Sequence, residues 1–303
     1  MRLRPFALIQ PEGVAEAVAE LGRAGNARVI AGGTALVPMM RLGMIRPDCV
    51  IALDRVKALG GIREQDGALR LGAMVTMADL HRALLVRAGW PLLAEAAGRV
   101  ATPAIRSSAT LGGNLAYAEA ASDVAPALLC LEAAVEIAGA QGERTVPIGQ
   151  FFTSFFETAL GPGEIAISIS VPPCPPGAVA GYVKFCSRSA EDKPLVGVAA
   201  LFSLDGPRGR CVDARIALGG VAPTAIRSAR AETSLRGETL SDEALRAAAE
   251  AAVGDADPLS DLMGTAEYRR AMVRVWVRRL LTTLRDGNSR GSSDHNRAGG
   301  SSV

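Results

Sequence analysis

The segment PPCPPG at residues 172–177 limits the possible folds of this 303-residue chain more than any other feature. Its prolines have no backbone N–H donor, so the segment cannot continue a helix or supply the hydrogen-bond ladder of a sheet. We therefore expect a linker here, with one domain before it and a smaller domain after it. The chain is 49% hydrophobic, which is enough to give both domains a core.

The residues before this linker mix helical and strand-like patterns, which indicates an α+β domain. Asp66-Gly67 lies between two strand-like runs and indicates a hairpin, and Thr76 followed by Asp79 indicates a capped helix. Residues 102–123 are expected to be rich in loops. Helices are predicted over 14–23, 36–40, 76–87, 90–100 and 124–132. Strands are predicted over 28–31, 49–53, 61–63, 69–72, 135–138, 144–148 and 165–171.

Beyond the linker the pattern changes from strands to helices. Ser241 caps a helix through about residue 253, and a longer amphipathic helix is predicted over 266–284. Residues 286–303 have no periodicity and almost no apolar side chain, so we expect them to be disordered. The long helix carries a cationic stripe, either a solvated face or a partner contact, of Arg270, Arg274 and Arg278. Antiparallel strands are predicted over 179–185, 196–204 and 212–218.

Charge and composition argue against several classes of function. The 33 Lys and Arg nearly balance the 31 Asp and Glu, and only 4% of residues are aromatic, so nucleic acid is not an expected partner. With two histidines, His81 and His295, and five separated cysteines, a metal or iron–sulfur cluster on this chain is not expected. No apolar run is long enough to span a membrane. The odd cysteine count and the absence of a signal-like start predict a cytoplasmic protein.

Two glycine segments carry the strongest indication of chemistry, AGGTAL at 31–36 and ATLGGN at 109–114. A diphosphate needs several backbone N–H groups pointing into one concavity, and glycine permits both the dihedral angles and the close approach. There is no GxGxxG fingerprint, so a Rossmann site is not expected. From spacing alone, ordinary turns in a chain with 33 glycines remain an open alternative to a phosphate cradle.

These segments and their neighbours also carry a family resemblance. The motifs, in chain order, are AGGTAL at 31–36, IRSSATLGGNLA at 105–116, ASDVAPALL at 121–129, YVKFCSR at 182–188 and SDLMGTAEYRRAMVRVWVRRLL at 260–281. Together they resemble the FAD-binding subunit of the molybdenum hydroxylases. This is the family of the carbon monoxide dehydrogenase medium subunit and the xanthine dehydrogenase FAD-binding subunit. The resemblance covers about residues 1–285.

The resemblance implies a two-lobed FAD-binding domain of the vanillyl-alcohol oxidase type, with lobes over residues 1–60 and 61–173. A smaller C-terminal domain of antiparallel sheet and helices is expected over 177–285, before the tail at 286–303. On this fold the two glycine segments would hold the diphosphate of FAD from opposite sides. Arg106 would support the second segment.

The resemblance also implies which residues contact the cofactor. Asp123 matches an acidic residue beside the ribityl and flavin region, although its position also suits a cap for the helix that starts at Val124. Lys184 matches a lysine that can stabilise charge on the reduced flavin, although a lone lysine in a strand is commonly a surface residue. The expected FAD-binding residues are Ala31, Gly32, Gly33, Thr34, Ala35, Val100, Thr110, Gly112, Gly113, Asn114, Asp123, Ile165 and Lys184.

The function implied is that of an electron-transfer subunit in a heterotrimeric molybdenum hydroxylase, expected to form a dimer of heterotrimers. FAD would bind to this chain, molybdopterin to a large partner chain and 2Fe-2S clusters to a small partner chain. One departure from the family pattern is Glu119-Ala120 in place of the usual Asp-Pro. Two alternatives stay open. One is a self-contained FAD oxidase of the vanillyl-alcohol oxidase type, for which only His81 offers a histidine attachment point, and the other is an interaction subunit without FAD.

Overall fold

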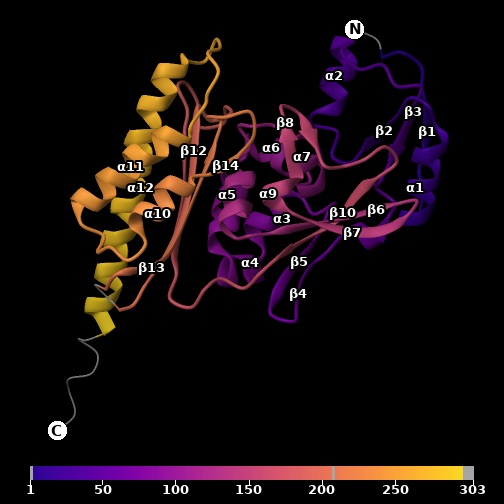
Figure 1. Ribbon diagram of the computed structural model, residues 1–303. Helices are drawn as coiled ribbons and strands as arrows, with labels where there is room; N and C mark the ends of the chain where they lie inside the picture. The colour runs from indigo at the N-terminus through magenta and orange to yellow at the C-terminus, as the bar shows by residue number, and fades with distance from the viewer. Residues whose placement is uncertain (1–2, 207–208, 296–303) are drawn as a thin grey trace. The chain divides into compact units, whose positions relative to one another are not determined.

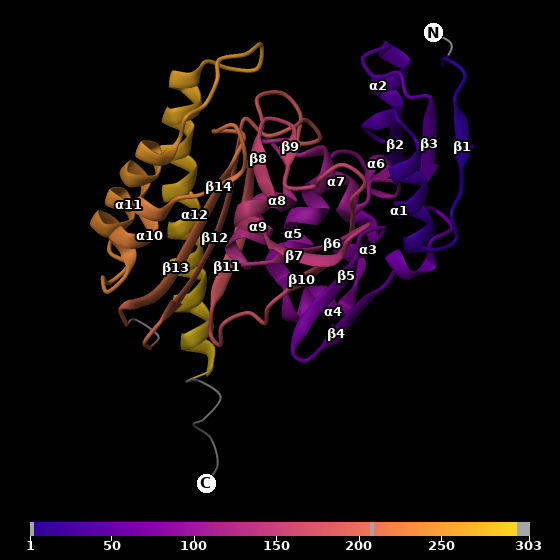
Figure 2. The same ribbon diagram turned by 45° about the vertical axis from the view of Figure 1, so that its right-hand side comes forward.

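The computed structural model describes residues 3–206 and 209–295. The described residues form two compact units: the first contains the described residues up to 119 together with 131–173, and the second contains 120–130 together with the described residues from 174 onward. Figures 1 and 2 show the helices and strands of both units. Each unit combines sheet and helix, which confirms the α+β prediction.

The first unit begins with a small parallel sheet and its helices. The elements are β1 (Ala7–Ile9), α1 (Val14–Arg23), β2 (Ala27–Ile30), α2 (Leu36–Leu42), β3 (Cys49–Ala52) and the 3₁₀ turn η1 (Lys57–Leu59). The strand order is β1-β3-β2. All four residues of β3 are buried, as expected for a middle strand, whereas β1 is largely exposed. The exposure and shortness of β1 explain why no apolar pattern predicted it.

The rest of this unit is built on a five-stranded antiparallel sheet. The strands are β4 (Ile62–Gln65), β5 (Ala68–Gly72), β6 (Ala134–Gly139), β7 (Gly142–Pro147) and β10 (Ile165–Val171). Their order is β4-β5-β10-β6-β7. Asp66 and Gly67 have φ angles of 53° and 76°, as the predicted hairpin turn requires. Ile51 of β3 belongs to one apolar cluster with Ala138 and Ile165, so the core continues from one sheet to the other.

Short helices and one small hairpin complete the first unit. They are α3 (Met77–Arg82), α4 (Leu84–Gly89), α5 (Pro91–Arg99), α6 (Pro103–Arg106), α7 (Leu111–Tyr117), α9 (Ile148–Phe151), β8 (Phe152–Ser154) and β9 (Glu157–Thr158). Thr76 and Asp79 form the predicted capping box of α3. The single helix predicted over 76–87 is wrong, because Ala83 leaves the helical conformation and separates α3 from α4. The break allows both helices to pack against α5.

The prediction of a loop-rich stretch over 102–123 is also wrong, because α6 and α7 lie within it. Thr102 and Thr110 cap the two helices by accepting hydrogen bonds from the backbone N–H groups of Ile105 and Gly113. Glycine is about 1 kcal/mol less favourable than alanine within a helix. The glycines of α7 therefore gave no indication of a helix in the sequence. The cap offsets part of this cost.

The second unit is an antiparallel sheet covered by helices. Its elements are α8 (Val124–Cys130), β11 (Val179–Phe185), β12 (Val196–Leu204), β13 (Cys211–Gly219), β14 (Ile226–Arg227), α10 (Ala229–Leu235), α11 (Asp242–Asp255) and α12 (Ala266–His295). The strand order β11-β12-β13-β14 confirms the three predicted strands. In Figure 1, α10, α11 and α12 cover one face of this sheet. Val198 and Phe202 of β12 lie in their apolar core, and α8 contacts β12 and β13 as well.

Two boundaries differ from those predicted. The segment 120–130 lies within the sequence assigned to the second lobe, 61–173, yet α8 packs in the second unit because its fully buried apolar residues contact β12 and β13. α12 continues to His295, although disorder was predicted from residue 286. A helix that has already formed extends easily, since each added residue gains a hydrogen bond. Residues 296–303 lie outside the described residues, and disorder there stays a prediction.

Two arginines of the cationic stripe of α12, Arg270 and Arg274, are paired within the second unit. Arg270 lies 3.4 Å from Asp257, and Arg274 pairs with Glu250 of α11. These contacts favour a solvated, internally paired face over a partner contact. Across the described ranges, no helix combines the length and apolar composition needed to cross a bilayer.

Candidate functional site

The two glycine segments line one pocket of the first unit. The pocket has a volume of about 300 Å³, at the lower end of the range for small-molecule sites. Its walls come from the turn between β2 and α2, the start of α7 and the start of β10. The predicted residues that line it are Ala31, Gly32, Gly33, Thr34, Ala35, Thr110, Gly112, Gly113, Asn114 and Ile165.

Gly32 brings the two segments into direct backbone contact. A Cβ atom at this position would lie 1.8 Å from the carbonyl oxygen of Ser108 and 3.2 Å from the Cα of Ala109. No side chain can be accommodated at such a distance, so any other residue would push the two segments apart. The fold therefore requires Gly32 with or without a ligand.

Gly33 is required for a different reason. Its φ angle of 71° lies in the left-handed region that favours glycine, and this turn leads the chain from β2 into α2. Its carbonyl accepts a hydrogen bond from the N–H of Val37 at 3.0 Å. Among the described residues, none accepts a hydrogen bond from the backbone amides of Gly33, Thr34 or Ala35. These three adjacent donors line the pocket and are available to a ligand.

The second glycine segment is shaped by its own cap. The N–H of Gly113 donates to Thr110 Oγ1 at 3.2 Å, and a Cβ on Gly113 would lie 2.8 Å from that oxygen. A Cβ on Gly112 would lie 2.6 Å from the Cβ of Ala73. Both glycines are therefore needed to start α7 in this position. The Thr110 hydroxyl accepts one bond here and can still donate its proton.

Two charged side chains, Arg28 and Glu164, also line the pocket. Glu164 accepts hydrogen bonds from Arg144 Nε at 2.8 Å, from Arg144 Nη2 at 2.6 Å and from the N–H of Gly161 at 2.6 Å. The bond from Arg144 holds the pKa of Glu164 at about 2, against an ordinary 4.5, while burial opposes this shift and the Gly161 bond adds to it. Glu164 is thus a fixed carboxylate at the wall of the pocket.

Val100 is a predicted site residue that is missing from the described lining of this pocket. It is buried at the end of α5, where its carbonyl accepts a hydrogen bond from Arg106 Nη1 at 2.8 Å. The same nitrogen donates to the carbonyl of Ala101 at 2.6 Å. Ala101 has a φ of 37°, which is uncommon for alanine, so Arg106 stabilises a difficult turn. The printed contacts of Arg106 are with this turn and not with the second glycine segment, so its predicted support of that segment stays a prediction.

Neither histidine nor cysteine occurs among the described lining residues of the pocket. His81 Nδ1 lies 3.0 Å from the carbonyl oxygen of Ala94, and a Cβ on Gly98 would collide with its ring. In the second unit, burial raises the pKa of the Cys130 thiol to about 12. The pocket therefore offers no histidine or cysteine for covalent attachment of a flavin.

Asp123 and Lys184 form a buried ion pair in the second unit. Lys184 Nζ lies 3.1 Å from Asp123 Oδ2, and the two side chains are only 4% and 7% exposed. Lys184 is thus not a surface residue. Ser122 Oγ accepts a hydrogen bond from the N–H of Ala125 at 3.3 Å, so Ser122 supplies a cap at the start of α8.

Tyr182 completes this cluster, and sequence analysis did not single it out. Its hydroxyl donates to Asp123 Oδ1 at 2.8 Å, and the residue is 3% exposed. Tyr182 and Lys184 are two residues apart on β11, so both side chains point to the same face of the sheet. A Cβ on Gly197, the β12 partner of Lys184, would lie 2.8 Å from the Tyr182 hydroxyl. The two-residue spacing predicts that Tyr182 and Lys184 share one face of the strand, but nothing in the sequence indicates that Asp123 contacts them.

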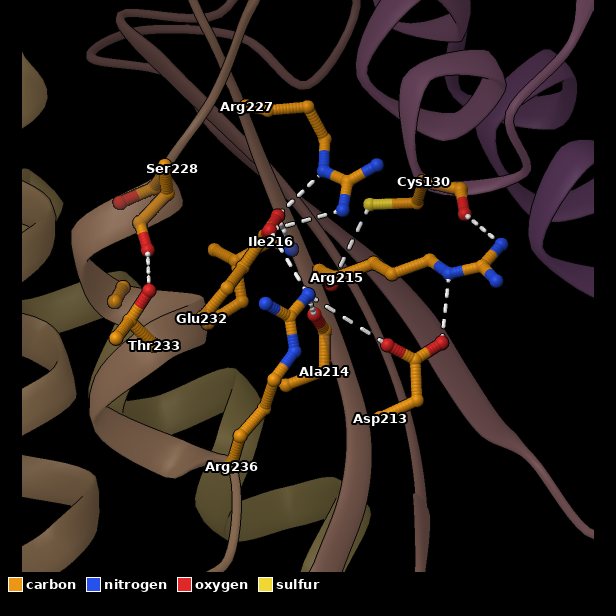
Figure 3. Close-up of polar contacts among 12 residues, drawn as sticks. Cys130, Asp213, Ala214, Arg215, Ile216, Arg227, Ser228, Glu232, Thr233 and Arg236 are labelled. Carbon is orange, nitrogen blue, oxygen red and sulfur yellow. Dashed lines mark hydrogen bonds and ion pairs between the residues drawn. The ribbon is translucent and has the colours of Figure 1, made fainter.

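Arginines of the sheet hold the other end of α8, and Figure 3 shows the contact that Arg215 makes with Cys130. Arg215 Nη1 donates to the carbonyl of Cys130 at 3.2 Å, and Arg227 Nη1 donates to the carbonyl of Leu129 at 3.3 Å. The last carbonyls of a helix have no partner within it. The sheet thus fixes the helix that begins beside Asp123. The carboxylates that pair with these two arginines are Asp213 and Glu232.

Two family models match the chain. Residues 4–174 match the FAD binding domain in molybdopterin dehydrogenase. Residues 181–284 match the CO dehydrogenase flavoprotein C-terminal domain. The two matches are separated by residues 175–180, which include the end of the proline-rich linker.

Similar proteins of known function match over nearly their whole length. The chain is 37% identical to the alpha subunit of the 6-hydroxypseudooxynicotine dehydrogenase complex of Paenarthrobacter nicotinovorans, over 93% of this chain and 95% of the relative. It is 38% identical to the carbon monoxide dehydrogenase medium chain of Hydrogenophaga pseudoflava, over 89% and 94% of the two chains.

Solved structures agree with these matches. A chain of the Hydrogenophaga pseudoflava carbon monoxide dehydrogenase superposes with a TM-score of 0.91 at 37% identity, covering 94% of this chain and 98% of that one. A chain of quinoline 2-oxidoreductase from Pseudomonas putida 86 superposes with a TM-score of 0.90 at 31% identity, covering 95% and 100%.

Proposed function

Because this chain belongs to the family of FAD-binding subunits of the molybdenum hydroxylases, we propose that it transfers electrons within a heterotrimeric enzyme of that family. In the proposed assembly, a large partner chain holds molybdopterin and hydroxylates the substrate. A small partner chain holds 2Fe-2S clusters and delivers the electrons to this chain. The assembly would be a cytoplasmic dimer of heterotrimers. FAD supplies the redox chemistry when bound, taking up electrons and passing them to a terminal acceptor.

The observation that carries this proposal is the meeting of both glycine segments in one pocket. Gly33, Thr34 and Ala35 line it with three adjacent amides that have no acceptor among the described residues, and Gly112, Gly113 and Asn114 line it from the second segment. Adjacent unbonded backbone donors suit a diphosphate, which brings negative charge and several acceptor oxygens. Glu164, the carboxylate among the described lining residues, is already paired with Arg144. We assign the diphosphate of FAD to these segments, with Thr110 and Ala31 at their edges and the backbone near Ile165 on a third side.

We further assign Asp123 and Lys184 to the flavin and ribityl part of the cofactor. A buried carboxylate can accept hydrogen bonds from hydroxyl groups, and a buried ammonium can stabilise negative charge on the reduced ring. Both groups are already held in place, Asp123 by Tyr182 and Lys184 by Asp123. Val100 remains a proposed contact on the strength of the resemblance alone.

The test is to purify the full chain together with its co-expressed neighbouring gene products and to record an absorption spectrum. We expect the bands of oxidised flavin with added iron–sulfur absorbance, and FAD in the supernatant after heat release. Two further chains should co-purify. A colourless chain that takes up no added FAD would contradict the cofactor assignment. A flavin-containing chain that purifies without partners would contradict the heterotrimer.

A further inference from the structure

The tip of the β8–β9 hairpin has an unusual composition. β8 ends at Ser154 and β9 begins at Glu157, so the turn consists of Phe155 and Phe156. Tight turns of this length favour glycine, asparagine and aspartate. Here two phenylalanines occupy the turn, and they are 41% and 54% exposed. Neither the turn geometry nor burial in a core explains these residues.

Phe156 also has an unfavourable backbone conformation. Its φ angle is 55°, in the left-handed region, where a bulky residue is a genuine outlier. Such conformations persist where the surroundings hold them, and they cluster at sites of function. Phe155 is not among the described residues with a positive φ angle. Of the two adjacent phenylalanines in the turn, Phe156 therefore has the strained backbone conformation and Phe155 does not.

The ring of Phe156 contacts Tyr117, a residue that lines the pocket. The two ring centroids are 5.2 Å apart with a tilt of 53°, which is a favourable aromatic contact. Tyr117 is the last residue of α7 and lines the pocket. Figures 1 and 2 both show the hairpin beside α7. Phe156 is not itself among the described lining residues, and its ring contact with Tyr117 connects it to the pocket.

We propose that Phe156 is a positioning residue, which holds Tyr117 as an aromatic wall for a planar ring of FAD. The inference rests on the proposed function, since it takes FAD as the ligand of this pocket. α7 begins at the glycine segment assigned to the diphosphate and ends at Tyr117, roughly 10 Å further along at 1.5 Å per residue. One helix thus carries a phosphate-binding end and an aromatic end, which are the two chemistries that a dinucleotide presents.

The two phenylalanines of the turn supply a matched experiment in the full chain freed of flavin. Phe156→Gly removes the ring and also relieves the backbone strain, because glycine adopts this φ angle readily. We expect an unchanged or higher midpoint of thermal unfolding for the flavin-free variant, together with an FAD dissociation constant about tenfold higher. A role in folding alone would lower the unfolding midpoint instead. Phe156→Tyr keeps the ring and should stay within about twofold of wild-type affinity.

Phe155→Gly is the control, because it removes the neighbouring exposed ring of the same turn. Its FAD affinity should equal that of the wild type. Equal losses in the two glycine variants, or full FAD affinity in Phe156→Gly, would overturn the inference. A wild-type chain that binds no FAD would instead contradict the proposed function.

A competition series with ADP identifies which ring of FAD is involved. ADP carries the adenine and the diphosphate but no flavin. If Phe156→Gly weakens ADP and FAD by the same factor, the wall holds the adenine. If it weakens FAD alone, the wall holds the isoalloxazine.

Discussion

The pocket of the first unit and the buried cluster of the second unit are built by opposite means. In the pocket, Gly32, Gly112 and Gly113 allow backbone segments to approach because they lack a Cβ atom. In the cluster, Asp123 and Lys184 are side chains that stay buried because each neutralises the other. The shape of the pocket thus depends on glycines that lack a Cβ atom, whereas the cluster depends on the attraction between two opposite charges.

This difference predicts which kind of substitution disrupts each site. Adding a single carbon atom at Gly32 should damage the pocket, whereas removing a single charge should damage the cluster. The same contrast explains why the pocket residues form continuous motifs, while the cluster joins positions that are 61 residues apart. Substitutions of three kinds test the comparison.

The largest effect is expected from Lys184→Met. It leaves the Asp123 carboxylate buried beside Tyr182 without the neutralising ammonium, and breaking a buried pair in this way costs about 3–5 kcal/mol. Urea unfolding of the full chain, followed by a probe in the second unit, measures the loss. The double variant Lys184→Met/Asp123→Asn removes both charges and should recover most of the stability. A loss below about 1 kcal/mol in the single variant would show that the pair is not electrostatically important.

A smaller loss of stability, but a complete loss of FAD binding, is expected from Gly32→Ala. The added Cβ would meet the carbonyl oxygen of Ser108, and overpacking of this kind costs about 1–3 kcal/mol. Since the two glycine segments must separate, the pocket amides lose their arrangement. Gly25→Ala is the control, because a Cβ there meets nothing within 4 Å. Flavin binding by Gly32→Ala at wild-type affinity would show that the close contact is not what shapes the site.

Local signals in the sequence predict much of this fold. The proline-rich linker, the Asp66-Gly67 hairpin and the Thr76 cap each depend on residues within a few positions of one another. The antiparallel strands after the linker were predicted for the same reason, because alternation along a strand is local. α7 was missed because the contact that favours it, Gly112 against Ala73, joins residues far apart in the chain.

The residues of the candidate site also divide into those that local motifs predict and those that only the fold brings together. The glycine segments were recognisable as motifs, but two explanations for them, turns and a phosphate cradle, could not be separated by spacing. The structure shows that Gly32 and Gly112 are needed by the fold and that Gly33, Thr34 and Ala35, whose amides are unbonded among the described residues, line the pocket. Tyr182 could not be predicted, because its partner Asp123 directly precedes α8, a helix that packs outside its own sequence domain.

The smallest effect is expected at the ion pair on the pocket wall, which sharpens the contrast with the buried pair. Arg144 is 43% exposed, so solvent screens its interaction with Glu164 far more than that of Lys184 with Asp123. Arg144 lowers the pKa of Glu164 from 4.5 to about 2 in the folded protein. A carboxyl group with a depressed pKa stabilises the folded state at pH values above its unfolded pKa, and this contribution is lost as the pH falls.

The difference in urea midpoint between wild type and Glu164→Gln should therefore be constant above about pH 5 and shrink between about pH 4.5 and 2. Glu157→Gln, at an exposed carboxyl on β9, controls for the removal of one charge. A difference that grows as the pH falls would mean that Glu164 is protonated in the folded protein, and the pocket would then hold a neutral acid in place of a fixed anion.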